Sequence, residues 1–238
     1  MEKEYIKVEK PTVSFSKNTD VLLTMDDEFW KNWIFYCLLS FYKEFDKTEL
    51  RQKIENNPSR IEKTIADFIR NYLRKDIVFN GYCKFLIDRE PLNEGDFEGY
   101  YDIKIQHSYW EKDNQKIAFY FECKNLKEKP QDLINKYVYY NKGNRIFDGG
   151  VYRYFNGKYA QSQDFGGMIG FVLEGNLFTI KNEILGKLQK TKFDTSSNGN
   201  FIKFIDNSIE QNDFTFDTYH YRENKEFVIH HLLFNLCQ

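Results

Sequence analysis

The sequence predicts an α/β fold, and three observations lead to this expectation. Apolar residues repeat at helical spacing over residues 29–41 and again over 61–73. Two strand-like runs, 99–105 and 117–124, are joined by a polar segment suited to a tight turn. The apolar run 166–173 has the character of a buried strand, entered through glycines that allow close backbone approach. We therefore expect a mixed β-sheet core flanked by helices, with an N-terminal helical segment and C-terminal strands.

The first quarter of the chain is expected to be mostly helical. Asp26 and Asp27 can cap the first helix, because their carboxylates accept hydrogen bonds from unpaired backbone N–H groups. A second helical stretch, 48–55, ends before Asn57 and Pro58. These two residues break the chain and restart it with a cap and a first-turn proline.

Shorter signals predict the remaining elements. Residues 77–87 are expected to form the first strand of the core, followed by a polar loop over 89–99. The tyrosine-rich stretch 149–159 contains an Asn156-Gly157 turn, which predicts a hairpin. The other expected elements are helices at 130–141 and 180–188 and strands at 201–205, 214–221 and 227–236.

Composition excludes several classes of protein. No segment reaches the roughly 20 apolar residues that span a bilayer, and the N-terminus lacks the regions of a signal peptide. The four cysteines have no spacing that indicates a zinc site or a disulfide framework, so a reducing cytoplasmic location is expected. The glycines of the 166–173 run match no nucleotide-binding fingerprint, and no nucleotide cofactor is implied.

The most informative feature is a pair of acids on the two central strand-like runs. If the chain folds back about the polar segment, Asp102 falls opposite Glu122 or its neighbour. Opposed side chains have Cβ atoms roughly 5 Å apart, so two carboxylates there can share one divalent cation. Lys124 follows two residues after Glu122 and therefore lies on the same face of the strand. A second Glu-x-Lys triplet, 223–225, has no apolar strand before it and is assigned to a solvated surface.

Asp102, Glu122 and Lys124 resemble the signature of the PD-(D/E)XK, or restriction-endonuclease-like, nuclease superfamily. The sequence departs from the signature at Tyr101, where the family pattern has proline. The resemblance implies that the three residues are catalytic and that the enzyme uses Mg²⁺, with Mn²⁺ as a substitute. It also implies that Asp102, Glu122 and the backbone carbonyl of Cys123 hold the metal.

The likeness covers about residues 60–125 and bears on further acids. In the family an acid on the helix before the sheet often joins the metal site, and Glu62 is the matching residue here; a solvated glutamate is the alternative. Glu94, Asp96 and Glu98 crowd the loop before the aspartate. Each of these three is an additional ligand or has no role, and for each one singly we expect no role.

The resemblance leads us to expect a single nuclease-like domain over residues 1–238. Within it, 1–56 is the N-terminal helical extension, 57–175 the catalytic core and 176–238 the C-terminal α/β completion. The superfamily frequently forms homodimers. Outside residues 124–159 the chain is acidic, which alternatively indicates a partner subunit.

Basic residues gather after the proposed catalytic lysine. The whole chain has a net charge of −2, whereas residues 124–159 hold eight Lys or Arg against three Asp or Glu. Clustered cations bind phosphate backbones, and a solvated basic helix face is the equally weighted alternative. The residues expected to bind nucleic acid are Lys127, Lys129, Lys136, Lys142, Arg145 and Arg153.

The expected function is metal-dependent endonucleolytic hydrolysis of phosphodiester bonds. Double-stranded DNA is the expected substrate, and the resemblance makes a role in restriction or antiviral defence plausible. Three alternatives stay open: an RNA-cleaving toxin-like nuclease, a catalytically silent nuclease-fold binding module, and an interaction protein with a surface ion cluster. His220 and Arg222 can touch phosphate from one strand face, but structural roles are favoured for His220, His230 and His231.

Overall fold

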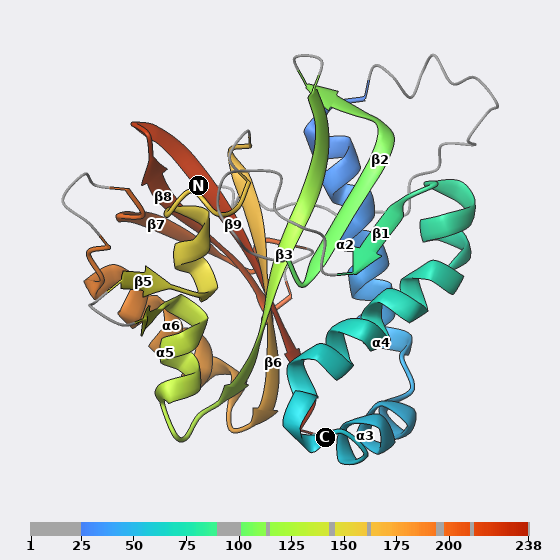
Figure 1. Cartoon of the computed structure of the whole chain (residues 1–238), viewed down its shortest axis with the longest axis horizontal. Coiled ribbons are helices and arrows are strands. Elements are labelled where there is room, and N and C mark those ends of the chain that lie inside the picture. The colour runs from blue at the N-terminus through green and yellow to red at the C-terminus, as the bar shows by residue number, and fades with distance from the viewer. Residues whose placement is uncertain are drawn as a thin grey trace.

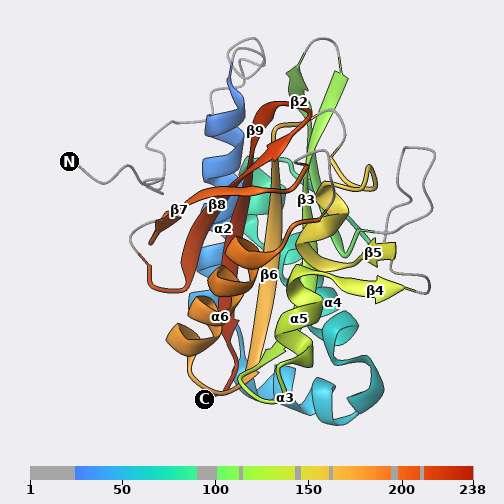
Figure 2. The ribbon, with the colours of Figure 1, turned by 90° about the vertical axis from the view of Figure 1, so that its left-hand side faces the viewer.

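The main feature of the structure is one seven-stranded mixed sheet with helices on both faces (Figures 1 and 2). This arrangement has the α/β architecture that the sequence predicts. The computed structural model describes residues 25–89, 101–112, 115–142, 146–160, 163–193, 198–209 and 212–237. The loop acids Glu94, Asp96 and Glu98 lie outside these residues.

The helices of the N-terminal quarter form where the sequence predicts them. Helix α2, Asp27–Glu44, begins after Asp26, whose Oδ1 accepts a 2.9 Å hydrogen bond from the N–H of Phe29. The other elements of this region are α3, Lys47–Glu55, the 3-10 turn η1, Pro58–Arg60, and α4, Ile61–Lys75. No helix in the described part of the chain is long and apolar enough to cross a lipid bilayer.

The predicted strand at 77–87 is wrong over most of its length. Ile77–Tyr82 forms a π-helical turn, η2, and only Leu86–Arg89 forms a strand, β1. The turn forms because the Asp76 carboxylate accepts a 2.7 Å hydrogen bond from the N–H of Phe79, which caps a helical turn instead of starting a strand. Ile77 is 68% exposed, so this apolar run does not have the inward face that a core strand requires.

The sheet combines a parallel centre with antiparallel margins. Its strand order is β1-β2-β3-β6-β9-β8-β7, in which β3, β6 and β9 are parallel and the outer pairs are antiparallel. The predicted hairpin at the centre of the sequence is confirmed as the β2–β3 pair. The strand bounds are β2, Ile103–Lys112; β3, Gln115–Lys127; β6, Phe165–Glu174; β7, Phe201–Asp206; β8, Thr215–Arg222; and β9, Lys225–Asn235.

The face of the sheet opposite α2 and α4 carries elements that the sequence predicts only in part. They are α5, Asp132–Val138, the two-stranded β4–β5 ribbon of Tyr140–Lys142 and Ile146–Asp148, the 3-10 turn η3, Gly150–Tyr154, and α6, Leu177–Lys190. The predicted 149–159 hairpin is therefore wrong. Gly150 has φ +51°, and a Cβ there would collide with the carbonyl oxygen of Tyr137, so the chain turns tightly against α5 instead of extending.

Strand β3 is buried on both faces and therefore lies at the centre of the molecule. Phe119, Phe121 and Cys123 belong to the core on the α2 and α4 side, whereas Tyr120 and Leu126 belong to the core on the α5 and α6 side. Figure 1 shows these two pairs of helices on opposite sides of β3. Any polar side chain near the middle of this strand needs partners, because an unpaired buried charge is costly.

Candidate active site

The candidate site forms where β3 loses one of its two neighbours. Strand β2 pairs with β3 up to the Ile103–Phe121 pair, whereas β3 continues beside β6 to Lys127. From Glu122 onward the opposite side of β3 is therefore an open edge. Asp102 lies one step before Ile103, so the register puts it opposite Glu122, as predicted.

Carboxylates satisfy the backbone groups of this open edge. The N–H of Cys123 donates a 2.7 Å hydrogen bond to Asp102 Oδ2, and the N–H of Asn125 donates a 3.2 Å bond to Glu62 Oε2. Unpaired backbone N–H groups are costly away from water, and these two acids take the place of the missing strand. Helix α4 thus brings Glu62 to the same edge as the β2–β3 acids.

Three oxygen atoms converge on the ammonium group of Lys124. Its Nζ lies 2.6 Å from Glu122 Oε1, 3.1 Å from Glu62 Oε1 and 2.8 Å from the carbonyl oxygen of Cys123. The Lys124 side chain is 15% exposed, so this point is near the surface but largely enclosed. The predicted site residues Asp102, Glu122, Cys123, Lys124 and Glu62 are therefore all brought together.

Glu122 has further partners on the other side of its carboxylate. It is fully buried, and Nη1 of Arg153 lies 3.0 Å from Oε1 and 3.1 Å from Oε2. The hydroxyl of Tyr159 donates a 2.9 Å hydrogen bond to Oε2 and accepts a 2.7 Å bond from Arg153. Two cations and a phenol thus compensate one buried carboxylate, which is how a charge is held inside a protein.

A second buried acid, Asp148, fixes the far end of Arg153. Its Oδ1 lies 3.3 Å from Nε of Arg153, and its Oδ2 lies 3.0 Å from Nζ of Lys158. Burial by itself raises the pKa of Asp148, but hydrogen bonds from Lys158 and the N–H of Gly149 and the charge of Arg153 hold the pKa below its usual value. Asp148 is therefore ionised and anchors the guanidinium that contacts Glu122.

The environment raises the pKa values of both Asp102 and Lys124, which favours the neutral acid and the charged ammonium. Burial, together with the charges of Glu122 and Glu62, raises the pKa of Asp102 to about 7, although Lys124 and the N–H of Cys123 act against the rise. Burial disfavours the Lys124 ammonium, but the surrounding carboxylates outweigh it and raise its pKa above the usual range. At neutral pH Lys124 is charged, whereas Asp102 exists in both forms.

The donor set fits a hard divalent cation. Mg²⁺ prefers carboxylate and carbonyl oxygens, which are the groups that gather here. In the described ranges, no group of three or more His, Cys, Asp or Glu side chains is arranged to hold a metal ion. The Lys124 ammonium takes the point where the oxygens converge, and Asp102 is turned to the N–H of Cys123. A cation at that point would require Lys124 to move.

The residues expected to contact nucleic acid have different environments. Lys127 pairs with Glu174 at 3.2 Å, and Lys136 pairs with Asp132 at 3.5 Å on the exposed side of α5. Lys129 is exposed. Lys142 lies in β4, but its side chain is outside the described part, as is the whole of Arg145. Arg153 contacts Glu122 and Asp148, so it belongs to the site rather than to a solvated basic face.

The histidines near the C-terminus are buried in the sheet. His231 lies 2.9 Å from the hydroxyl of Tyr137 and 2.8 Å from Oγ1 of Thr218. His230 Nδ1 lies 2.9 Å from Asp217, while Arg222 donates a 2.8 Å bond to the carbonyl oxygen of Ala160. The structural roles favoured from the sequence for His220, His230 and His231 agree with these buried positions.

Sequence reasoning missed Tyr159 and Asp148 as members of the site. Tyr159 follows Glu122 by 37 residues and reaches it through the turn after η3. No local spacing links these residues, so only the tertiary fold identifies them. No protein-family model, curated protein or solved structure matches this chain. A function therefore has to be argued from the chemistry of the site.

Proposed function

We propose that the protein is a metal-dependent nuclease that hydrolyses phosphodiester bonds, with DNA as substrate and Mg²⁺ as cofactor. The single observation that carries the proposal is the convergence of Glu122 Oε1, Glu62 Oε1 and the Cys123 carbonyl on one point, 2.6–3.1 Å from each. An oxygen cage of this kind is suited to a hard cation. Its present occupant is an ammonium group on a flexible side chain.

A restriction-endonuclease-like fold is the finer structural proposal. It is supported by a mixed sheet in which an antiparallel hairpin precedes a parallel strand pair. Asp102 and the Glu122-x-Lys124 motif lie at the point where the hairpin opens. Helix α4 supplies an acid to the same edge. A role in restriction or antiviral defence, and assembly as a homodimer or with a partner subunit, remain part of the same proposal.

In this mechanism each residue has a distinct task. Asp102, Glu122, Glu62 and the Cys123 carbonyl would hold the cation, which would supply Lewis-acid activation of the phosphate and of a water. Lys124, once displaced from the cage, would orient that water and stabilise charge on the phosphate oxygens. Arg153 and Tyr159 fix the orientation of the Glu122 carboxylate, because both donate to it. Asp102, with a pKa of about 7, releases its proton readily near neutral pH.

A second candidate is a catalytically silent module with the same fold. Both oxygens of Glu122 already have cationic partners, so the cluster satisfies its own charges without a metal. In that case Asp102 and Glu62 serve only to complete the edge of β3. An RNA-cleaving enzyme with the same site is a variant of the first candidate, since the site does not fix the sugar.

Metal binding and cleavage together test the proposal. Free Mn²⁺ is titrated by electron paramagnetic resonance against the wild type, Glu122→Gln and the control Glu223→Gln, which removes the acid of the second Glu-x-Lys triplet. The proposal expects Mn²⁺ binding that is lost only in Glu122→Gln. It also expects cleavage of DNA, but not of RNA, offered side by side. If the wild type takes up no Mn²⁺, with or without DNA, the silent module is the correct candidate.

A further inference from the structure

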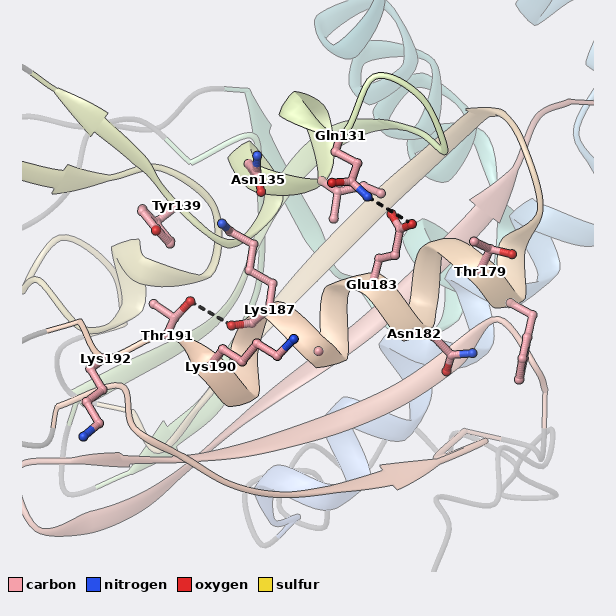
Figure 3. Close-up of a pocket in the computed structure, with 13 residues that line it drawn as sticks. Gln131, Asn135, Tyr139, Thr179, Asn182, Glu183, Lys187, Lys190, Thr191 and Lys192 are labelled. Carbon is pink, nitrogen blue, oxygen red and sulfur yellow. Dashed lines mark hydrogen bonds between the residues drawn. The ribbon is translucent and has the colours of Figure 1, made fainter.

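A basic groove lies between α5 and α6, and its residues are not part of the β3 site. It encloses about 790 Å³ (Figure 3). One wall is α5 and the residue that follows it, Tyr139, and the other wall is α6 with residues 191 and 192. The sequence reasoning did not single out this region, because its cations are spread over one helix and the segment after it.

The charge of the groove is mostly positive. Lys187, Lys190 and Lys192 line it, and its acid, Glu183, accepts a 3.3 Å hydrogen bond from Gln131. Among the described residues, no carboxylate forms an ion pair with any of the three lysines. Lys187 instead lies over the Tyr139 ring at 4.6 Å, and Figure 3 shows it reaching from α6 toward α5. Three cations that have no acidic partner in the described part of the chain favour an anionic ligand.

The ordinary role of such lysines is to complement the carboxyl end of a helix. Lys187 and Lys190 are in the last turn of α6 and do so. That role does not explain Lys192, which follows the helix, or Phe178, which lies in its first turn at the other end of the groove. The Phe178 side chain is 64% exposed, and Nζ of Lys181 lies 5.7 Å from the centre of its ring.

The combination of an exposed ring with spaced lysines is typical of surfaces that bind unpaired nucleotides. Bases stack on the aromatic faces, while ammonium groups contact the phosphates. Between Phe178 and Lys190 the helix rises about 18 Å, enough for a strand of several nucleotides. Amide side chains of Gln131, Asn135 and Asn182 line the hollow between the ends and offer hydrogen bonds to base edges. A duplex presents no base face to such a ring, so the groove favours a single strand.

We propose that the α5–α6 groove binds a single-stranded segment of nucleic acid, with Lys187, Lys190 and Lys192 on phosphates and Phe178 stacked on a base. This inference rests on the proposed function only in taking nucleic acid as the ligand. The groove would hold an unpaired part of the substrate away from the β3 site.

Fluorescence anisotropy with a labelled 12-nucleotide oligo(dT) tests the groove, in EDTA so that no metal-dependent cleavage occurs. The variants are Lys190→Gln/Lys192→Gln and Phe178→Ala, all at exposed positions that leave the Lys187–Tyr139 contact in place. The matched control is Lys203→Gln/Lys225→Gln, which removes two exposed charges from β7 and β9. Far-ultraviolet circular dichroism verifies that each variant is folded.

The groove double variant should reduce the salt dependence, the slope of log K against log salt concentration, by about 1.4, because each lost phosphate contact contributes about 0.7. Phe178→Ala should weaken binding between about 5-fold and 150-fold, with the charge control unchanged. Equal effects of the groove and control variants would overturn the proposal. So would duplex binding that depends on the two lysines but not on Phe178, or displacement by polyglutamate at matched charge. Binding that is intact in every variant refutes the groove alone, whereas failure of all forms to bind any nucleic acid refutes the proposed function as well.

Discussion

Replacing Arg153 with alanine leaves the buried Glu122 carboxylate without its guanidinium partner. Nη1 of Arg153 contacts both oxygens of Glu122, at 3.0 and 3.1 Å, and its Nε contacts Asp148. Breaking a buried ion pair from one side costs about 3–5 kcal/mol, because the remaining charge is uncompensated. Lys124 and Tyr159 still contact Glu122, so we expect the lower end, about 3 kcal/mol. In a chain of this length that loss lowers the melting temperature by about 6–12 °C.

Thermal and urea unfolding measure the effect, and Lys158→Ala is the matched control. Lys158 and Arg153 are both 21% exposed and both contact Asp148, but Lys158 does not contact Glu122. Its removal leaves Asp148 with Arg153 and the N–H of Gly149, so we expect a loss below about 1 kcal/mol. Equal losses in the two variants would refute the view that Glu122 is the acid that Arg153 compensates.

Divalent metal connects this stability experiment to the proposed function. In Arg153→Ala, a cation bound in the cage at the Lys124 position would supply positive charge that Glu122 has lost, so Mn²⁺ should raise the melting temperature of the variant more than that of the wild type. At 100 times its dissociation constant, a ligand contributes about 2.7 kcal/mol, which would restore most of the loss. A variant that Mn²⁺ does not stabilise would count against a metal site at Glu122.

Two other predictions concern stability. His107 is buried and stacked on Trp30, with ring centres 4.4 Å apart, and burial lowers its pKa to about 4. The unfolded chain therefore takes up a proton near pH 6.5 that the folded chain does not. As a result, the free energy of unfolding falls as the pH drops from 6.5 toward 4. His107→Gln should remove up to about 3 kcal/mol of this loss in urea unfolding at pH 4, and an unchanged pH dependence would contradict the assignment. Gly150→Ala should destabilise by at least about 2 kcal/mol, because its φ is positive and Tyr137 blocks a Cβ, whereas Gly186→Ala in α6, where a Cβ meets nothing within 4 Å, should stabilise by about 0.5–1 kcal/mol. Similar effects at the two glycines in thermal melts would show that the packing around Gly150 is not as described.

The central hairpin illustrates what the sequence can predict and where it stops. Alternation fixes Glu122 and Lys124 on one face of β3, and this part of the prediction needs no tertiary information. The register of the β2–β3 pair depends on more than this alternation. Near the turn, Glu111 pairs with Lys116. If that register continued along β2 without a shift, Asp102 would lie opposite Asn125, whose side chain is on the other face of β3 from Glu122. A register shift between Gln106 and Glu111 restores the pairing of Asp102 with Glu122, and no feature of the sequence predicts this shift.

The errors have two physical causes: a local cap that the apolar pattern does not reveal, and tertiary contacts that override local patterns. At 77–82 the hydrogen bond from the N–H of Phe79 to the Asp76 carboxylate stabilises a helical turn, although the apolar composition favours a strand. At 149–159 the two glycines turn the chain against α5, and the Asn156-Gly157 signal forms a local turn without flanking strands. Arg153 joins Glu122 across 31 residues, so its basic character alone indicated phosphate binding rather than an internal ion pair.

Nicking of supercoiled plasmid in Mg²⁺ or Mn²⁺ tests the central claim most directly. The comparison uses the wild type, Glu122→Gln, Lys124→Ala and the control Glu223→Gln, each verified as folded. The account predicts metal-dependent nicking by the wild type and the control that is abolished by both site variants. Nicking that persists in Glu122→Gln and Lys124→Ala would contradict the assignment of the active site to the open edge of β3.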